Sequence, residues 1–513
     1  MRTMIPPAAR RTIAAAGLLS AVILISPLAA GPLLAQRTHA RPARSGAAAI
    51  RRADLRADVY AMAADSMRGR EAGTLDELRA AAWIAERARA AGLEPAGDGG
   101  TYFQYFPLRR VRTADAGTVT LGGQPLPLWR EAAVVSPVDA ELDLPLVFVG
   151  QGREADLAGV DLHGKAAAAV VSPPRDVPAP GMSLWAVRYA RTAIRERAAF
   201  LVAHGAAAVV LVADSVTDGA YGWLASSFSR GSYGVDSANA SMRPGAQPPV
   251  ILLRRAAIDR VRAPAQRLTA ALHSESFTYP SVNVVARVRG TSPRLRGEYV
   301  LFSGHVDHDG VRAPVDGDSI YNGADDNASV DAGVLAIGRA FARHPERRSA
   351  LFVWHGAEER GLLGSRWFAA HPTVPRESIA AVLNADMIGR NSPDSAALLG
   401  ATPPHRNSAA LVRMAMAANA RTSRFIVDTS WDAVTHPEGW YFRSDHLPYA
   451  RAGIPALMFT TLLHPDYHTP RDEPQRIDYA KLARVARWMY ETGRAVANAR
   501  VRPAVDPGFK LER

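Results

Sequence analysis

The chain of 513 residues contains no cysteine. This absence excludes disulfide bonds, cysteine-based zinc sites, thiol nucleophiles and lipid attachment to an N-terminal cysteine. Any metal site must therefore be built from histidine, aspartate and glutamate side chains. Lysine is also scarce, because only Lys165, Lys481 and Lys510 are present, so arginine carries nearly all of the positive charge.

The sequence also lacks the pattern of a nucleic-acid-binding protein, although its net charge is +12. The arginines are scattered, and no dense basic block alternates with aromatic residues. We interpret the charge as a solvated surface and expect no nucleic-acid partner. Hydrophobic residues make up 48% of the chain, enough for a large core. The length predicts about two to four domains.

No uninterrupted apolar run has the length of a typical membrane span. A basic segment with Arg10 and Arg11 precedes an uncharged stretch at 12–35, whose continuous apolar core covers only residues 13–25. This pattern is typical of a secretory signal peptide, which we place at 1–35. We expect a secreted or periplasmic protein with no stable membrane span once the signal is removed. A retained N-terminal anchor and twin-arginine export both stay open.

The character of the sequence changes near residues 130 and 276. After the second point, short β-prone runs alternate with helix-like stretches, which predicts an α/β fold with a mostly parallel mixed sheet flanked by helices. The part between these points has β-prone runs but no cluster of acidic or histidine residues, so we expect an inserted, mainly-β domain there. The predicted order after the signal peptide is a flexible spacer at 36–52, a discontinuous catalytic domain at 53–129 and 276–500, the inserted domain at 130–275 and a C-terminal tail at 501–513.

Two further segments carry specific expectations. Apolar residues recur at helical spacing between Ala53 and Ala91, which predicts an amphipathic helix that ends at Gly92. Residues 224–249, inside the expected insertion, are rich in glycine, serine and proline, and they predict a long loop.

Acidic and histidine side chains follow four of the predicted strands. In open α/β sheets, ligand sites form beyond the carboxyl ends of the strands, so we expect these side chains to converge. Each has an ordinary explanation when taken alone, such as a surface histidine, a helix cap or an acidic turn. Together they form a donor set suited to zinc. The residues are His305, Asp307 and His308 after 299–302, Glu358 and Glu359 after 351–354, Asp386 after 380–383 and His468 after 456–460, with Asp326 at the start of a predicted helix.

The motifs around these residues resemble peptidase family M28, the co-catalytic zinc aminopeptidases. The insertion is similar to a protease-associated (PA) domain, chiefly through Asp161 to Lys165 before an apolar strand. The resemblance implies two Zn²⁺ ions per chain. The matching segments are 303–308, 321–329, 356–365, 384–389, 444–446 and 467–469, and the implied metal ligands are Asp326 as the bridge, His305 and Asp386 for one ion, and Glu359 and His468 for the other.

The resemblance also implies three catalytic roles. Glu358 is the expected general base, Asp307 is expected to hold the ring of His305, and Tyr467 is expected to hydrogen-bond the oxyanion. The sequence departs from the family pattern in two places. Val330 stands where the family usually has glycine, and Asp309, where leucine is common, adds negative charge near the site.

These features predict a secreted di-zinc aminopeptidase that hydrolyses N-terminal residues of peptides. Two other reactions stay open on the same fold, namely those of a dipeptidase or carboxypeptidase-like exopeptidase and of a glutaminyl-cyclase-like acyl transferase. A non-catalytic binding protein is disfavoured because no ligand of the expected set is missing. We expect the inserted domain to gate or narrow access to the site.

Overall fold

The computed structural model describes residues 46–172, 184–235 and 247–511. The expected signal peptide and most of the expected spacer lie outside these residues. Within the described part, no helix combines the length and apolarity that a membrane crossing requires.

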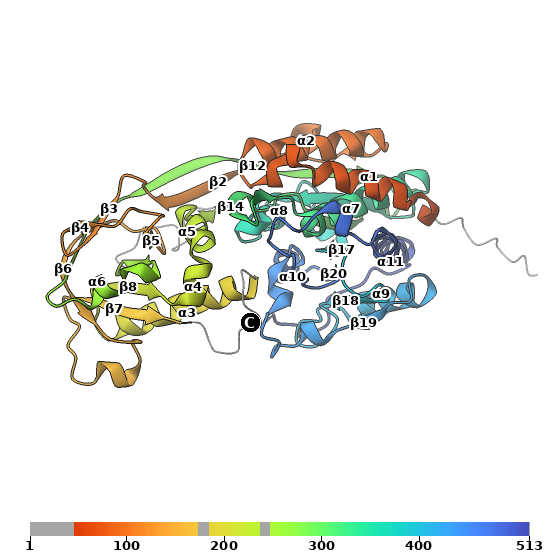
Figure 1. The fold of residues 1–513 in the computed structure, drawn as a ribbon. Helices are drawn as coiled ribbons and strands as arrows, with labels where there is room; N and C mark the ends of the chain where they lie inside the picture. Colours follow the sequence, from red (N-terminus) through yellow and green to blue (C-terminus); the bar gives the residue numbers. More distant parts are fainter. Residues whose placement is uncertain (1–45, 173–183, 236–246, 512–513) are drawn as a thin grey trace, which may run out of the picture. The chain divides into compact units, whose positions relative to one another are not determined.

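The larger of the two main sheets has ten strands and carries the expected catalytic residues. The strands β16, β13, β17 and β20 lie next to one another and run parallel. Strand β12 pairs antiparallel with β16 and with the long strand β2, which lies beside it (Figure 1). This arrangement confirms the predicted mixed sheet with a parallel centre. The order is β19 (Ile426–Asp428), β18 (Ser395–Leu399), β20 (Ala456–Thr460), β17 (Ile379–Ala385), β13 (Tyr299–His305), β16 (Ser349–His355), β12 (Ser274–Val288), β2 (Phe103–Thr113) and β9 (Ser232–Gly234), with β1 (Glu94–Pro95) paired to β12.

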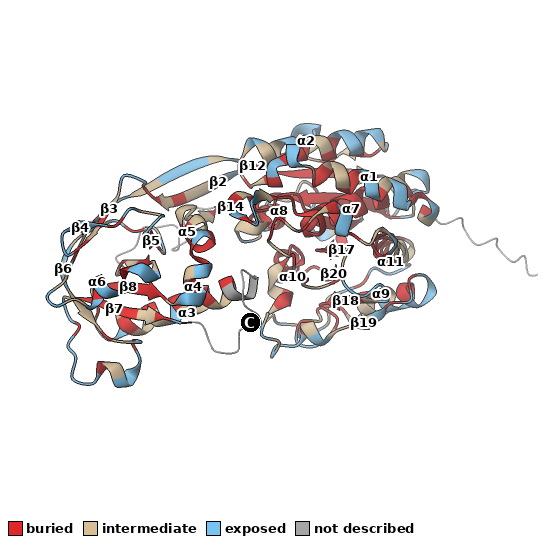
Figure 2. Ribbon diagram, viewed as in Figure 1, coloured by how far each residue is buried: buried red, intermediate tan, exposed pale blue. Residues whose placement is uncertain are grey.

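Strands β16, β17 and β20 are buried along their whole length, and in β13 only Tyr299 is partly exposed, because helices pack on both faces of the sheet (Figure 2). Their sequences are therefore continuous apolar runs rather than alternating ones. The last helix, α11, starts where the side chain of Asp478 accepts hydrogen bonds from the Ala480 and Lys481 amides. The helices are α1 (Arg52–Met62), α2 (Leu75–Ala90), α7 (Val330–Arg343), α8 (Leu363–Ala370), α9 (Ala409–Arg421), α10 (His446–Arg451) and α11 (Tyr479–Asn498).

The helix predicted between Ala53 and Ala91 is in fact two helices, α1 and α2, separated by a short 3₁₀ segment. Gly69 and Gly73 have positive φ angles of 69° and 70°, which an α-helix does not accommodate. Thr74 then starts α2, because its side chain accepts a hydrogen bond from the Asp76 amide. The helical spacing was correctly recognised, but the break between the two helices was not.

A second sheet of eight strands is consistent with the expected insertion. It includes β3 and β4, which begin before residue 130, so this sheet extends beyond the segment assigned to the insertion; the domain boundaries themselves stay predictions. The order is β4 (Gln124–Pro125), β3 (Thr118–Leu121), β11 (Arg267–Leu272), β6 (Ala140–Phe148), β7 (Ala166–Val171), β8 (Ala208–Ala213), β10 (Val250–Leu253) and β5 (Ala132–Val134), with helices α3 (Leu184–Ala203), α4 (Ser215–Gly219), α5 (Tyr221–Ser229) and α6 (Ile258–Arg262) in the same region.

The expected loop at 224–249 is partly wrong. Its first residues complete α5, and residues 232–234 form β9, which pairs antiparallel with β2 of the ten-stranded sheet. Arg110 of β2 also donates a hydrogen bond to the Arg230 carbonyl at 2.7 Å. The chain that follows α5 is thus attached to the sheet that carries the expected catalytic residues. A separate two-stranded hairpin, β14 (Gly310–Val315) with β15 (Asp318–Tyr321), lies between β13 and α7 in the sequence.

Candidate active site

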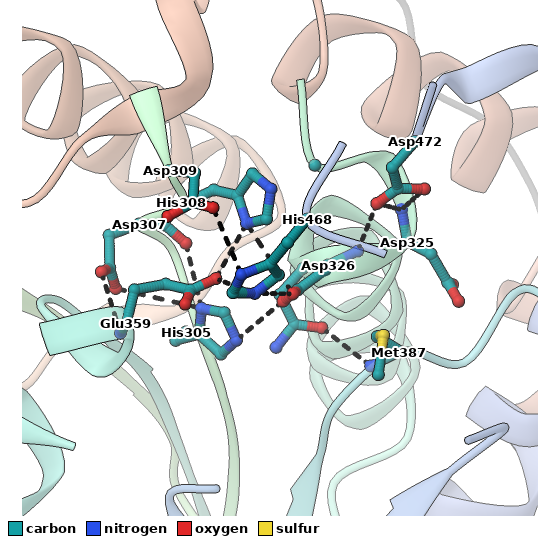
Figure 3. Close-up of polar contacts among 12 residues, drawn as sticks. His305, Asp307, His308, Asp309, Asp325, Asp326, Glu359, Met387, His468 and Asp472 are labelled. Atoms are coloured by element: carbon teal, nitrogen blue, oxygen red, sulfur yellow. Dashed lines mark hydrogen bonds and ion pairs between the residues drawn. The ribbon is translucent and has the colours of Figure 1, made fainter. Parts of the chain in front are cut away.

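The residues predicted at the strand ends converge as expected, around Asp326 (Figure 3). One oxygen of the Asp326 carboxylate lies 3.2 Å from Nε2 of His305, and the other lies 3.1 Å from Nε2 of His468. Asp386 is 3.7 Å from the same His305 nitrogen, and Glu359 is 3.0 Å from the same His468 nitrogen. The single carboxylate of Asp326 therefore joins two half-sites.

Two groups of side chains in this cluster could each hold a metal ion. The first contains His305, Glu358 and Asp386, and the second contains Asp326, Glu359, His468 and His308. The carboxylates of Asp326, Glu358, Glu359 and Asp386 are each nine-tenths or more buried, and the ion pairs that they form are with imidazoles. Buried carboxylates at this density need a strong compensating positive charge, which a bound cation supplies.

The two neighbouring glutamates have opposite electrostatic environments. Burial raises the pKa of Glu358 well above its ordinary value, and the Asp386 carboxylate adds to this effect while His305 opposes it. Burial also acts to raise the pKa of Glu359, but contacts with His468 and His308 lower it well below its ordinary value. Glu359 is thus held as an anion, whereas Glu358 is poised to exchange a proton.

The turn that carries Asp326 is held by residues that the sequence reasoning missed. The carboxylate of Asp472 accepts hydrogen bonds from the Asp325 amide at 3.0 Å and from the Asp326 amide at 3.0 Å (Figure 3). On the other side of the turn, the Gly389 amide donates to the Asp325 carboxylate at 2.6 Å. Burial, followed by repulsion from Asp472, raises the pKa of Asp325 to about 8. Asp472 lies 146 residues beyond Asp326, so no local pattern points to it.

A buried arginine, Arg70, connects the loops that carry His305 and Asp326. Its guanidinium donates hydrogen bonds to four main-chain carbonyls, at distances of 2.7 to 3.0 Å. The side chain is completely buried, so these bonds are protected from water. Arg70 therefore fixes the backbone beneath the site. The four acceptors are the carbonyls of Met62, Val306, Asn322 and Gly323.

Asp307 is placed differently from the expectation. Its carboxylate accepts hydrogen bonds from the amides of Glu358, at 2.9 Å, and Glu359, at 3.3 Å. The ring of His305 instead bonds to the main-chain carbonyl of Asp307, at 3.0 Å, and the side-chain carboxylate lies 3.9 Å away. In this structure Asp307 holds the glutamate turn through its side chain and the histidine ring through its backbone.

The segment that carries these residues matches a known peptidase family. The family model described as Peptidase family M28 covers residues 283–493. The match assigns this segment, 211 of the 513 residues, to peptidase family M28. A probable zinc metalloprotease of Pyrenophora teres f. teres (strain 0-1) is 32% identical over 129 residues, which are 25% of this chain and 26% of that protein. Aminopeptidase YwaD of Bacillus subtilis (strain 168) is 28% identical over 185 residues, which are 35% of this chain and 38% of that protein. The matched segments thus span well under half the length of these M28 relatives.

Solved structures share the fold over most of the chain. The aminopeptidase from Aneurinibacillus sp. strain AM-1 has a TM-score of 0.56 at 20% identity, over 90% of this chain and 97% of that one. The zinc aminopeptidase BSAP from Bacillus subtilis also has a TM-score of 0.56, at 19% identity, over 90% of this chain and 99% of that one. The shared fold therefore includes much of the eight-stranded sheet as well as the M28 segment.

The first departure from the M28 pattern, Val330, has a steric counterpart in Gly304. A Cβ atom placed on Gly304 would lie 2.3 Å from Cγ1 of Val330 and 3.2 Å from its Cβ. Gly304 directly precedes His305 on β13, and Val330 is the first residue of α7. The larger residue on the helix is accommodated because the strand has no side chain opposite it.

The second departure, Asp309, contacts a predicted metal ligand. Its Oδ2 lies 3.2 Å from Nδ1 of His468, which leaves Nε2 of that ring facing Asp326 and Glu359. A carboxylate in this position fixes the tautomer and the orientation of a ligating histidine. His308, which is not among the implied metal ligands, also reaches the site, with its Nδ1 2.9 Å from Glu359.

Several aromatic residues near the site belong to a mainly buried cluster. Trp440 and Tyr441 are 2% and 1% exposed and pack with Met387 and Leu447. Tyr467 is half-buried, and its ring lies against that of Trp440 with 6.1 Å between the centroids. Burial raises the pKa of Tyr467 well above its ordinary value, so its hydroxyl remains protonated and able to donate. Its part in the reaction stays a prediction.

Proposed function

We propose that the chain is a secreted di-zinc aminopeptidase. The observation that carries this proposal is the position of Asp326, whose two carboxylate oxygens face imidazoles from opposite half-sites at 3.2 and 3.1 Å. Such a carboxylate is suited to bridge two ions. The name of the M28 relative YwaD, an aminopeptidase, supports the choice among exopeptidase reactions.

The donor set fits zinc because it combines imidazole and carboxylate groups in a buried site. We assign His305 and Asp386 to one ion, Glu359 and His468 to the other, and Asp326 to both. In peptidases of this kind, zinc supplies Lewis acidity, which acidifies water and polarises the scissile carbonyl. Support for the assignment comes from Nε2 of His468, which faces the carboxylates of Asp326 at 3.1 Å and Glu359 at 3.0 Å.

Glu358 acts as the proton carrier in the proposed reaction. It accepts a proton from the attacking water and delivers it to the leaving amine. Its Oε2 lies 3.8 Å from Nε2 of His305, so the carboxylate stands beside the proposed metal ligands. The hydroxyl of Tyr467 stabilises the negative charge that develops on the substrate oxygen.

The proposed location rests on the signal-like pattern at 1–35. A secreted or periplasmic M28 enzyme acts on peptides outside the cytoplasm. Fractionation of cells that express the full chain, combined with N-terminal sequencing of the mature form, tests this part. Recovery of an uncleaved chain from the cytoplasm would contradict it.

The activity is tested by zinc content together with hydrolysis of aminoacyl anilides and their N-acetylated counterparts. We expect two zinc ions per chain and chelator-sensitive cleavage of the free-amine substrates alone. Glu358→Ala should retain both ions and lose turnover, while Glu377→Ala, which alters an exposed glutamate, should change neither. Loss of one ion in Glu358→Ala would instead make Glu358 a ligand. Two ions without cleavage of any anilide would direct the search to dipeptides or carboxyl-terminal residues.

A further inference from the structure

A pocket of about 360 Å³ adjoins one half of the candidate metal site. Glu359 and His468 are among its lining residues, so a group bound in the pocket lies next to that half-site. The opposite lining comes from α3, α5 and the strand β9, in the part of the chain that sequence analysis assigned to the insertion. Sequence analysis found no cluster of acidic or histidine residues in that part.

Four arginines line this pocket, and only two carboxylates pair with them. Asp309 contacts the guanidinium of Arg312 and lies 3.7 Å from that of Arg360. Glu71 lies 3.1 Å from Arg230 and 3.5 Å from Arg360. Glu359 also lines the pocket, but its contacts are with imidazoles. The fourth arginine is Arg191.

Arg191 has neutral contacts. Its guanidinium donates to the Ser227 hydroxyl at 2.7 Å and lies over the ring of Trp223, 5.5 Å from the centroid. Four guanidinium groups thus share two carboxylates. The arrangement leaves an excess of positive charge beside the candidate metal site.

Arg360 and Arg230 make further contacts, yet each has a nitrogen donor without a partner. The guanidinium of Arg360 lies over the Tyr233 ring, 5.4 Å from the centroid, and Arg230 donates to the Val311 carbonyl at 2.8 Å. Nε of Arg360 and Nη1 of Arg230 are buried without a hydrogen-bond partner within the described residues. The Arg360 side chain is only 8% exposed. Buried donors of this kind require a partner, and a planar guanidinium matches a carboxylate in shape and charge.

We propose that this pocket binds a carboxylate of the substrate and makes the enzyme selective for peptides that carry an acidic group next to the scissile bond. The inference rests on the proposed peptidase function. The carboxylate has two possible sources, which are the side chain of a glutamate or aspartate residue and the terminal carboxylate of a dipeptide. Both present the same two oxygens to Arg360 and Arg230.

Matched substrate pairs distinguish the two sources. Glutamyl and glutaminyl anilides differ only in the side-chain charge of the first residue. Leucyl-glutamate amide and leucyl-glutamine amide place that difference in the second residue. Leucyl-leucine and its amide differ only in the terminal carboxylate. We expect the acidic member of at least one pair to be cleaved with a kcat/KM about tenfold to a hundredfold higher than that of the neutral member.

Arg360→Gln should abolish this preference, so that the acidic and neutral members of a pair are cleaved with the same kcat/KM. Arg360→Lys keeps the positive charge but lacks the planar guanidinium that can bind both carboxylate oxygens, so it should retain part of the preference. The matched control is Arg195→Gln, because Arg195 is exposed on α3 one turn from Arg191 and does not line the pocket. Thermal unfolding of each variant separates loss of selectivity from loss of fold.

Cleavage of the neutral substrates without preference in any pair would overturn the inference and leave the peptidase function intact. If no substrate is cleaved, the peptidase function fails, and calorimetric titration of the zinc-loaded protein with glutarate and with neutral glutaramide decides the pocket separately. The proposal then predicts that glutarate binds more tightly than glutaramide, and that its affinity falls about tenfold in Arg360→Gln. Equal affinities in the parent and in Arg360→Gln would overturn the inference.

Discussion

Asp309→Asn should weaken zinc binding at one of the two half-sites. Asp309 is 3.2 Å from Nδ1 of His468, and the opposite nitrogen of that ring faces Asp326 and Glu359. Loss of such an outer carboxylate typically lowers metal affinity about tenfold to a hundredfold, or about 1.4 to 2.7 kcal/mol. The change keeps the shape of the side chain, so the effect isolates its charge.

The assay for Asp309→Asn is a zinc titration against a competing chromophoric chelator, which resolves the two binding constants. One constant should fall and the other should stay unchanged. Asp316→Asn is the matched control, because Asp316 follows β14 in the same segment and its side chain is 82% exposed. Asp309 also contacts Arg312 and Arg360, so the metal-free variant should unfold at a lower temperature than the parent. A lower unfolding temperature with both zinc constants unchanged would limit Asp309 to pairing these arginines and would refute the reasoning.

Three further predictions concern the packing and the electrostatics around the site. Gly304→Ala should destabilise the protein by about 2 kcal/mol through the contact with Val330. In the double variant, Val330→Ala should recover part of this loss. Additive changes of the two substitutions in the free energy of unfolding, measured with denaturant, would contradict the steric account. Arg70→Lys should lower the free energy of unfolding by about 3 kcal/mol or more, because one ammonium cannot reach four carbonyls in the geometry of the guanidinium, and an unchanged urea midpoint would argue against this role. Burial, aided by the charge of His305, lowers the pKa of His355 to about 3 from 6.5, so the unfolded chain takes up the proton first and stability falls as pH drops below about 6.5. At pH 5 this lowers the free energy of unfolding by about 2 kcal/mol. In denaturant titrations, His355→Gln should therefore lose less stability between pH 8 and pH 5 than the parent. An equal loss of stability in the variant and in the parent would exclude His355 as the source.

The sequence was informative where function depends on the ends of parallel strands. His305, Glu359, Asp386 and His468 each follow a continuous apolar run, and such runs in this chain are buried strands. The direction of parallel strands then places all four at one edge of the sheet. Short elements such as β18 and β19 were missed because three to five residues give too little periodicity.

The supporting residues could not be found in the same way. Arg70 and Asp472 act on main-chain groups far along the sequence, and main-chain acceptors and amides leave no mark on residue type. Asp309 was noticed as a departure from the family, but its partner His468 lies 159 residues away. Contacts of this kind depend on how the loops meet and require the three-dimensional structure.

The arginine pocket shows why overall charge was a poor guide. The scattered arginines were interpreted as a solvated surface, and that interpretation holds for exposed ones such as Arg195. Arg230, Arg312 and Arg360 are separated by 82 and 48 residues, yet all three line one pocket with side chains 12%, 4% and 8% exposed. Burying guanidinium groups is costly unless charge or hydrogen bonding compensates for it. Because Asp309 and Glu71 compensate only in part, the remaining donors are best explained by an anionic group of the substrate. The part of the chain assigned to the expected insertion would then contribute to the choice of substrate, in addition to the role in access that was expected of it.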